Sequence, residues 1–182
     1  MQAGLALSGC DRENGAQGQD APSDASQSPV PTRYAIDASH RGSPLPGALV
    51  RDEESQEAAL TELAGTPVIL NLWATWCGPC VEELPTLNRL AARVAGQAHV
   101  IALSQDLGDD GSGPRQFLIQ HGWGDLAAWH DPDNEIGLVY GGGLPTTILF
   151  GADGREVARV IGPMDWNGPA ARALLAEAGI TQ

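Results

Sequence analysis

The sequence predicts an α/β fold with a central mixed β-sheet flanked by helices, preceded by an extended N-terminal tail. Three observations indicate it. From about residue 45 onward, strand-like and helix-like segments alternate; two late strand-like segments flank a turn; and one more helical segment ends the chain. Alternating strands and helices are typical of parallel α/β sheets, and a late hairpin adds antiparallel pairing.

The first strand and the first helix follow each other directly. Val68–Ala74 is a nearly continuous apolar run, as expected for a strand covered on both faces. An apolar stripe typical of a helix comes next, with spacings of four and three, formed by Cys80, Leu84, Leu87, Ala91 and Val94. Pro85 lies inside this segment, and we expect it to kink the helix or interrupt its hydrogen-bond ladder.

The remaining elements are shorter. We expect strands at His99–Ser104 and Ala127–His130, with a helix at Pro114–His121 between them that ends before Gly122. Thr146–Phe150 and Glu156–Ile161 flank the turn Asp153-Gly154 and predict a hairpin. A final helix is predicted from about Pro169 to Ala178.

Composition excludes several classes of function. The formal charge is −13 and the pI is near 4.4, which argues against nucleic acid and against an electrostatic hold on anionic lipid. All ten cationic residues are Arg, so a phosphate-binding lysine and Schiff-base chemistry are excluded. Three cysteines are too few for a disulfide scaffold. Asp106–Gly111 lacks the ligand spacing of a calcium loop, so we interpret it as a surface loop.

The chemistry is centred on Trp76-Cys77-Gly78-Pro79-Cys80, where the first strand ends and the helix begins. At a helix N-terminus, unpaired amides and the helix dipole stabilise a thiolate, so an accessible Cys77 is suited to attack a disulfide. Cys80 lies one turn later on the buried stripe, where it can resolve the mixed disulfide. Pro79 restricts the turn and holds the pair near bridging geometry.

The alternative for a C-x-x-C pair is half of a zinc site. A structural zinc site needs two further ligands. Cys10 lies on the tail, and no ligand-pair spacing occurs among His40, His99, His121 and His130. We therefore favour redox chemistry and expect neither a metal nor a cofactor.

Two separated motifs carry a family resemblance. NLWATWCGPCVEELPTLNRL, followed far downstream by GGGLPTTILFGADGRE, resembles the TlpA-type branch of the thioredoxin-fold thiol–disulfide oxidoreductases. The resemblance covers roughly residues 45–182. It implies a central sheet of four or five strands, an extra N-terminal element and an insertion after the second core strand.

The resemblance also implies roles for residues near the motif. Pro145 corresponds to the family's cis-proline facing the cysteines, and the backbone of Leu144 would offer strand-like hydrogen bonds to a substrate. Gly78 and Pro79 would contribute to the same substrate surface. Trp76 is expected to line it beside Cys77, whereas Trp73, Trp123, Trp129 and Trp166 are expected to be packing residues.

This sequence departs from thioredoxin at Asn71. Thioredoxin has a buried aspartate at the matching place, where it assists proton transfer from the resolving cysteine. Asn71 cannot take a proton, so Glu82 or Glu83 could replace that aspartate, although helical carboxylates are usually solvated. Glu83 is the candidate for proton transfer because it is close in sequence to the buried thiol.

The N-terminal segment predicts a location. Leu7-Ser8-Gly9-Cys10 resembles a bacterial lipobox, so residues 1–9 are interpreted as a short or truncated lipoprotein signal segment and Cys10 as the lipid attachment site. Residues 10–44 would then be the anchor and flexible linker, and 45–182 the thioredoxin-like domain. Asp11 resembles a signal for retention on the inner membrane, which places the domain in the periplasm.

These observations predict a membrane-tethered, extracytoplasmic thiol–disulfide oxidoreductase that reduces disulfides in exported proteins. The Gly-Pro dipeptide matches that of thioredoxin, which favours reduction. The family implies a membrane electron donor acting by thiol–disulfide exchange, and we expect a monomeric domain. The alternatives are a thiol peroxidase of the same fold and a copper-handling or partner-binding module without turnover.

Overall fold

The computed structural model describes residues 33–108, 111–141 and 143–181. Cys10 and the proposed signal segment lie outside the described residues. A compact unit spans Thr32–Gln182, and its first strand already lies at Ala35–Asp37, upstream of residue 45. Within the described residues, no helix is long and apolar enough to span a membrane.

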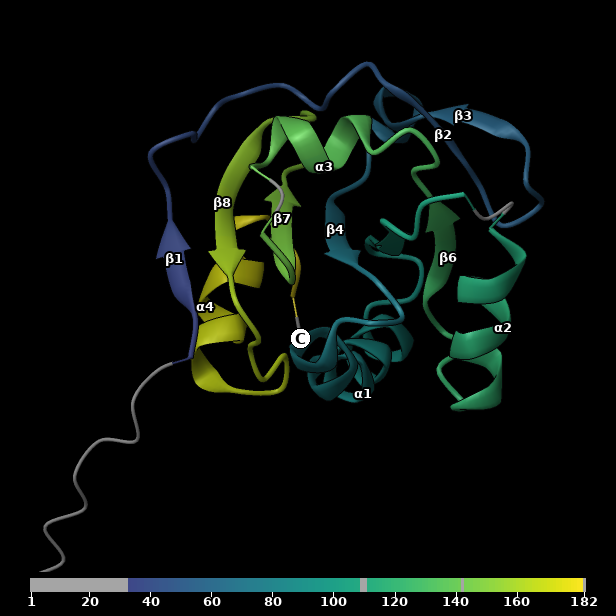
Figure 1. Ribbon diagram of the computed structural model, residues 1–182. Helices are drawn as coiled ribbons and strands as arrows, with labels where there is room; N and C mark the ends of the chain where they lie inside the picture. The colour runs from purple at the N-terminus through teal and green to yellow at the C-terminus, as the bar shows by residue number, and fades with distance from the viewer. Residues whose placement is uncertain (1–32, 109–110, 142, 182) are drawn as a thin grey trace, which may run out of the picture. The chain divides into compact units, whose positions relative to one another are not determined.

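One mixed sheet of eight strands organises the described residues (Figure 1). Its order is β1-β8-β7-β4-β5-β6-β2-β3. The strands are β1 (Ala35–Asp37), β2 (Leu49–Arg51), β3 (Glu57–Ala59), β4 (Val68–Trp73), β5 (His99–Ser104), β6 (Ala127–His130), β7 (Thr146–Phe150) and β8 (Glu156–Ile161).

Strand β4 separates the parallel part of the sheet from an antiparallel part, because it pairs parallel with β5 and antiparallel with β7. Strands β4, β5 and β6 are parallel, whereas β7 pairs antiparallel with both β4 and β8. The predicted mixed α/β sheet is therefore confirmed, and the five predicted strands occur where the sequence places them. The sheet is wider than the four or five strands that the resemblance implies, because β6 and the short N-terminal strands extend it.

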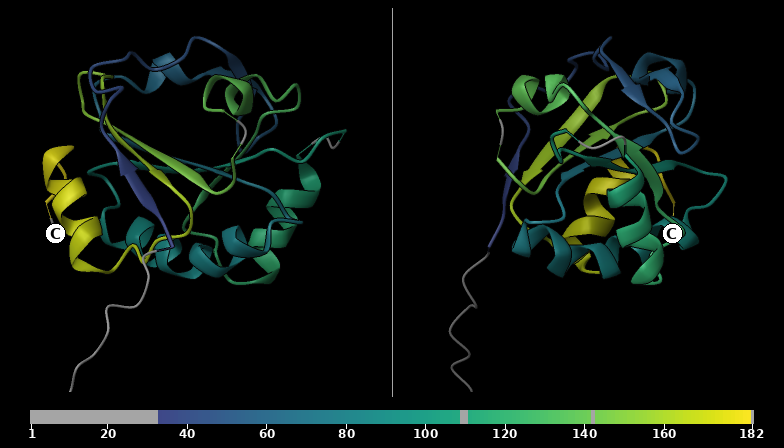
Figure 2. Two further views of the ribbon diagram at one scale, coloured as in Figure 1. Left: turned by 60° about the vertical axis from the view of Figure 1, so that its left-hand side comes forward. Right: turned by 45° about the vertical axis from the view of Figure 1, so that its right-hand side comes forward.

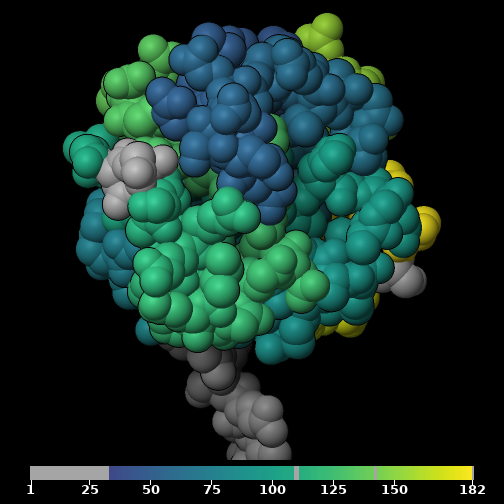
Figure 3. All heavy atoms as spheres, turned by 90° about the vertical axis from the view of Figure 1, so that its right-hand side faces the viewer, coloured from purple at the N-terminus to yellow at the C-terminus, as the bar shows by residue number. Residues whose placement is uncertain are grey.

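The N-terminal strands extend the sheet at both edges. β1 pairs antiparallel with β8, while β2 pairs with both β3 and β6. On the β6 side, Figure 3 shows the blue surface of the β2–β3 region against the teal and green surface around α2 (Ser112–Gln120) and β6. Arg115 of α2 donates there to the carbonyl oxygen of Glu53 at 2.6 Å. The α2–β6 segment is the insertion expected after the second core strand.

Helices cover both faces of the sheet (Figure 2). The helices α1 (Gly78–Arg93), α2 and α4 (Pro169–Glu177) lie on one face, where α1 and α4 bury apolar stripes against β4, β7 and β8. The 3₁₀ helix η1 (Leu60–Leu63) and α3 (Glu135–Val139) lie on the other face, where their side chains Leu60 and Ile136 pack into a second buried hydrophobic cluster. The short helix α3 was not predicted from the sequence.

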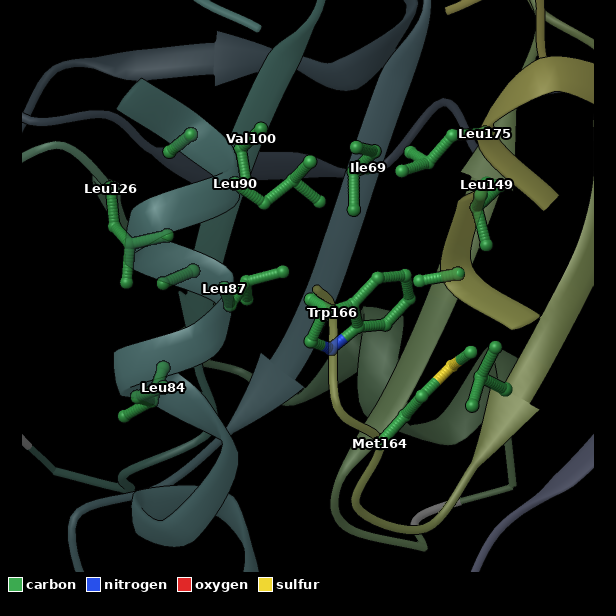
Figure 4. Close-up of a cluster of buried hydrophobic side chains, with 14 of the residues drawn as sticks. Ile69, Leu84, Leu87, Leu90, Val100, Leu126, Leu149, Met164, Trp166 and Leu175 are labelled. Carbon is green, nitrogen blue, oxygen red and sulfur yellow. The ribbon is translucent and has the colours of Figure 1, made fainter. Parts of the chain in front are cut away.

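The main core lies between α1 and the C-terminal part of the chain. Figure 4 shows Trp166 between Leu87 of α1 and Met164, and all three side chains are buried. The helix α1 continues through Pro85, which has no backbone N–H and so leaves a gap in the hydrogen-bond ladder, as expected. The large buried indole fixes the C-terminal segment against the second turn of α1, close to the cysteine motif.

Candidate active site

The two cysteines lie where β4 passes into α1. Cys77 is the N-cap residue of α1, and its Sγ accepts a hydrogen bond from the backbone N–H of Cys80 at 3.3 Å. Cys80 is in the first turn. The two Sγ atoms are joined by a disulfide of 2.02 Å, with the Cα atoms 5.3 Å apart. The helix N-terminus thus points unpaired amides at Cys77, as the sequence predicts.

The two sulfurs differ in exposure. Cys77 keeps 6% of its surface exposed, less than the accessible position expected, and Cys80 keeps none. The neighbours on the Cys77 side are open to solvent: Trp76 is 71% exposed, and Gly78 and Pro79 are also exposed. An incoming disulfide can therefore approach Cys77 between exposed residues, whereas Cys80 faces the protein interior.

Asp106 fixes the segment that leads to Cys77. Its carboxylate accepts hydrogen bonds from the backbone N–H and the hydroxyl of Thr75 at 3.1 and 2.7 Å. Ser104, at the end of β5, donates to the same carboxylate at 2.7 Å, and His130 Nε2 lies 2.8 Å from the Asp106 carbonyl oxygen. Asp106 thus ties the loop before the motif to the ends of β5 and β6.

One helical turn after Cys80 lies a buried polar network centred on Glu83. Glu83 is three residues after Cys80, hence on the same face of α1, and only 2% exposed. Its Oε1 accepts from Asn71 Nδ2 at 2.6 Å. Its Oε2 accepts from the backbone N–H of Met164 at 3.0 Å and from Trp166 Nε1 at 3.3 Å. Three segments of the chain, β4, α1 and the segment after β8, therefore meet at this carboxyl group.

Burial raises the pKa of Glu83 from 4.5 to about 7. Desolvation is the main cause, because the charged form loses its hydration; the three hydrogen bonds act in the opposite direction and limit the shift. The neighbouring Glu82 is exposed and pairs with Arg33 at 2.7 Å. Of the two glutamates considered from the sequence, only Glu83 is buried, on the same face of α1 as Cys80.

Pro145 and Leu144 precede β7. The Leu144–Pro145 peptide bond is cis, as predicted, and Pro145 is buried. Leu144 is partly buried and lines a cavity of about 360 Å³ together with Trp76. The residue before the proline and the residue before Cys77 therefore share one cavity, although they are far apart in the sequence.

The sequence and the fold agree with those of known redox proteins. The Redoxin family model matches residues 25–175. The chain belongs to the Redoxin family. It is 34% identical over 122 residues to the thiol–disulfide oxidoreductase ResA of Bacillus thuringiensis (strain Al Hakam), covering 66% of this chain and 69% of ResA. For ResA of Bacillus subtilis (strain 168) the identity is 29%, with 68% of each chain covered.

A solved structure supports the same family relationship. The crystal structure of a protein assigned as the thiol:disulfide interchange protein DsbE of Chlorobium tepidum superposes with a TM-score of 0.64 at 25% identity. The match covers 76% of this chain and 96% of that protein. The predictions of a TlpA-like thioredoxin fold and of an enzyme that acts on disulfides are confirmed: this Redoxin-family chain is a thiol–disulfide oxidoreductase.

Three features of the site were not predicted. Asp106 was interpreted as part of a surface loop, and its hydrogen bonds to Thr75 were not predicted. The two residues are 31 positions apart, and a local sequence pattern cannot indicate such a contact. Trp166, expected to be packing only, also donates to Glu83. Asn71 contributes as a donor, and its Oδ1 has no hydrogen-bond partner among the described residues. The burial of Glu83 could have been predicted, because Glu83 lies three residues after Cys80, which belongs to the buried stripe of α1.

Proposed function

We propose that this oxidoreductase reduces disulfides in exported proteins, with Cys77 as the attacking thiol and Cys80 as the resolving thiol. The observation that carries the proposal is the asymmetric pair at the start of α1. Cys77 is the N-cap beside exposed residues, and Cys80 is buried above a carboxyl group of raised pKa. Such asymmetry gives the two thiols different tasks.

In the first step, the Cys77 thiolate attacks one sulfur of the substrate disulfide. A bond forms between Cys77 Sγ and that sulfur, and the second substrate sulfur leaves as a thiolate. The N-terminal amides of α1 stabilise the negative charge on Cys77 before the attack. In the oxidised pair, the backbone N–H of Cys80 already points at this sulfur.

In the second step, Cys80 resolves the mixed disulfide. Its thiol gives a proton to Glu83, and the resulting thiolate attacks Cys77 Sγ, which releases the reduced substrate. A carboxyl group with a pKa of about 7 is suited to accept and return a proton near neutral pH. Asn71 donates a hydrogen bond to this carboxyl group and holds it in place. Asn71 and Glu83 together would then perform the proton transfer that a single buried aspartate performs in thioredoxin.

A second cavity offers the proton a route to solvent. Glu83 lines a cavity of about 190 Å³, whose other walls include Glu82, Thr86, Met164 and Asp165. Water in this cavity can exchange a proton with Glu83 without passing the disulfide. The exposed side chain of Glu82 lines the same cavity, whereas Trp76 does not appear in its walls.

The substrate would lie across the surface formed by Trp76, Gly78, Pro79, Leu144 and Pro145. Extended segments of partner proteins commonly add to a sheet edge or to an exposed backbone. The shared cavity between Trp76 and Leu144 supports this arrangement, because it joins the two segments that would contact the substrate. A partner that supplies electrons by thiol–disulfide exchange would use the same surface.

We further propose that the domain is held at the extracytoplasmic face of the inner membrane by a lipid on Cys10. Residues 10–44 would be the anchor and linker, of which the last part joins the sheet as β1, and 45–182 would form the rest of the catalytic domain. Support comes from the lipobox-like Leu7-Ser8-Gly9-Cys10. Cys10→Ser should move the protein from the membrane fraction to the soluble fraction and abolish the added mass of the lipid. An unchanged mass and distribution would contradict the anchor.

The direction of transfer is tested by the reduction potential of the Cys77–Cys80 pair. The full chain carrying Cys10→Ser is equilibrated in dithiothreitol or glutathione redox buffers, alkylated and weighed. A potential near the thioredoxin value of about −270 mV supports a reductant. A potential near about −120 mV, the range of a strong oxidant, would contradict the proposed direction.

A further inference from the structure

The cavity shared by Trp76 and Leu144 has a composition that the exchange chemistry does not require. The apolar part of its wall comes from Trp76, Leu107 and Leu144. Its polar groups are Gln105, Asp106 and Asn134. Among the described residues, one carboxylate and no cationic side chain line it.

Gln105 is the decisive group. It is 5% exposed, and its Nε2 donates to the carbonyl oxygen of Leu103 at 3.3 Å, which orients the amide. Its Oε1 is buried and has no hydrogen-bond partner among the described residues, although Gln105 lines the cavity. A buried acceptor without a donor costs free energy, so the position calls for a donor from outside the chain.

The oxygens of two amide side chains converge on Gly137. A Cβ at Gly137 would collide with both Gln105 Oε1 and Asn134 Oδ1. The glycine therefore leaves the space that brings these two acceptors together at one end of the cavity. Any larger residue at position 137 would displace them.

Asp106 adds charge and a free acceptor site. From the described residues, its Oδ1 accepts one hydrogen bond, donated by Thr75, and its Oδ2 accepts two, donated by Thr75 and Ser104. A carboxylate has about four acceptor positions, so Oδ1 can accept one more donor. The cavity thus combines several oxygen acceptors, a negative charge and, in Trp76, an exposed aromatic ring.

We propose that this cavity binds an arginine side chain next to the cysteine of the substrate, and so makes the enzyme select disulfides flanked by arginine. A guanidinium has five N–H donors and no acceptor, which matches Gln105, Asp106 and Asn134. Its aliphatic stem suits Leu107 and Leu144, and its planar cation suits the ring of Trp76. The inference rests on the proposed disulfide reduction for its biological meaning.

The test compares peptides of the form Ala-X-Cys-X-Ala, each in a mixed disulfide with 2-mercaptoethanol, as substrates of the reduced full chain. With X as arginine, the second-order rate constant should exceed that for norleucine about tenfold, consistent with charge-assisted hydrogen bonds. Glutamate should be slowest, and salt should shrink the differences. An isomer with both arginines moved to the peptide ends controls for overall charge and should lose most of the advantage.

Two variants locate the effect. Gln105→Met keeps the size of the side chain and should lower the arginine rate toward the norleucine rate. Leu107→Lys changes a side chain that is 72% exposed and should disfavour arginine, whereas the matched control Leu49→Lys, at 58% exposed on β2, should not. Equal rates for arginine and norleucine in the wild type would overturn the proposal, as would an arginine preference that survives both cavity variants.

Two further measurements separate this proposal from disulfide reduction itself. Bis(2-hydroxyethyl) disulfide has no side chain for the cavity, so its rate should be the same in the wild type and in Gln105→Met. If no disulfide at all is reduced, the proposed function fails. The peptides with serine in place of cysteine still test the cavity, because tryptophan fluorescence should give a Kd for arginine about tenfold below that for norleucine.

Discussion

The two cysteines of one short motif occupy opposite environments. Cys77 ends the loop after β4, next to a tryptophan that is 71% exposed and to a cavity that faces solvent. Cys80, one turn later, has no exposed surface and lies above the buried Glu83 network. A single helical turn at the start of α1 therefore separates the proposed substrate surface from the proposed site of proton transfer.

The strongest way to break this comparison is to remove each cysteine in turn. Cys77→Ala should abolish turnover, because the buried Cys80 cannot reach a protein disulfide. Cys80→Ala should also end turnover, but after one attack, so that a stable mixed disulfide with substrate accumulates. Non-reducing electrophoresis followed by mass spectrometry distinguishes the two results. A mixed disulfide on Cys80 in Cys77→Ala would reverse the assigned roles.

The next largest effect is expected at Glu83. Glu83→Gln removes the proton acceptor and should slow the resolving step at pH 7 by about 10- to 100-fold, in line with general base catalysis. The first attack by Cys77 should change little, so mixed disulfide should build up in stopped-flow and acid-quench experiments. Glu82→Gln, an exposed neighbour, is the matched control and should behave as the wild type. Equal resolving rates in both variants would exclude proton transfer by Glu83.

The raised pKa of Glu83 also predicts a pH dependence of stability in the oxidised protein. The folded state binds the carboxyl proton more tightly than the unfolded state, so the free energy of unfolding falls as pH rises from about 4.5 to about 7. The loss amounts to roughly 3 kcal/mol. Urea unfolding of Glu83→Gln should lack this part of the pH dependence, while Glu82→Gln should retain it. Parallel curves for the wild type and Glu83→Gln would contradict the shift.

The sequence predicted the parts of this comparison that follow from local patterns. The C-x-x-C motif, the strand before it and the apolar stripe of α1 predict that Cys80 lies in the core, because helical periodicity places it among buried leucines. The exposure predicted for Cys77 itself is wrong, since only its neighbours are exposed. The downstream Leu-Pro was identified through the family resemblance. Apolar runs and turn residues located β4, β5, β7 and β8.

The rest depends on contacts between distant segments. The network around Glu83 joins residues from β4, α1 and the segment after β8, and no spacing within one segment indicates it. The three-residue strands β1 and β2 are too short to show periodicity, so they form because strands β8 and β6 offer them paired edges. Asp106 was taken for a surface residue, since an acidic loop is usually solvated.

The smallest effect on turnover is expected from substitution of Asp106, which contacts the loop that precedes Cys77. Asp106→Asn keeps the size of the side chain but loses the charge-assisted hydrogen bonds to Thr75, so it should cost about 1–3 kcal/mol locally. The amide of Thr75 should then exchange its hydrogen faster, and turnover should fall only a few-fold, because Cys77 remains the N-cap of α1. Asp133→Asn, on an exposed turn, is the matched control. If the amide hydrogen of Thr75 exchanges equally slowly in both variants, the loop before Cys77 is held in place by α1 alone. That result would contradict a positioning role for Asp106.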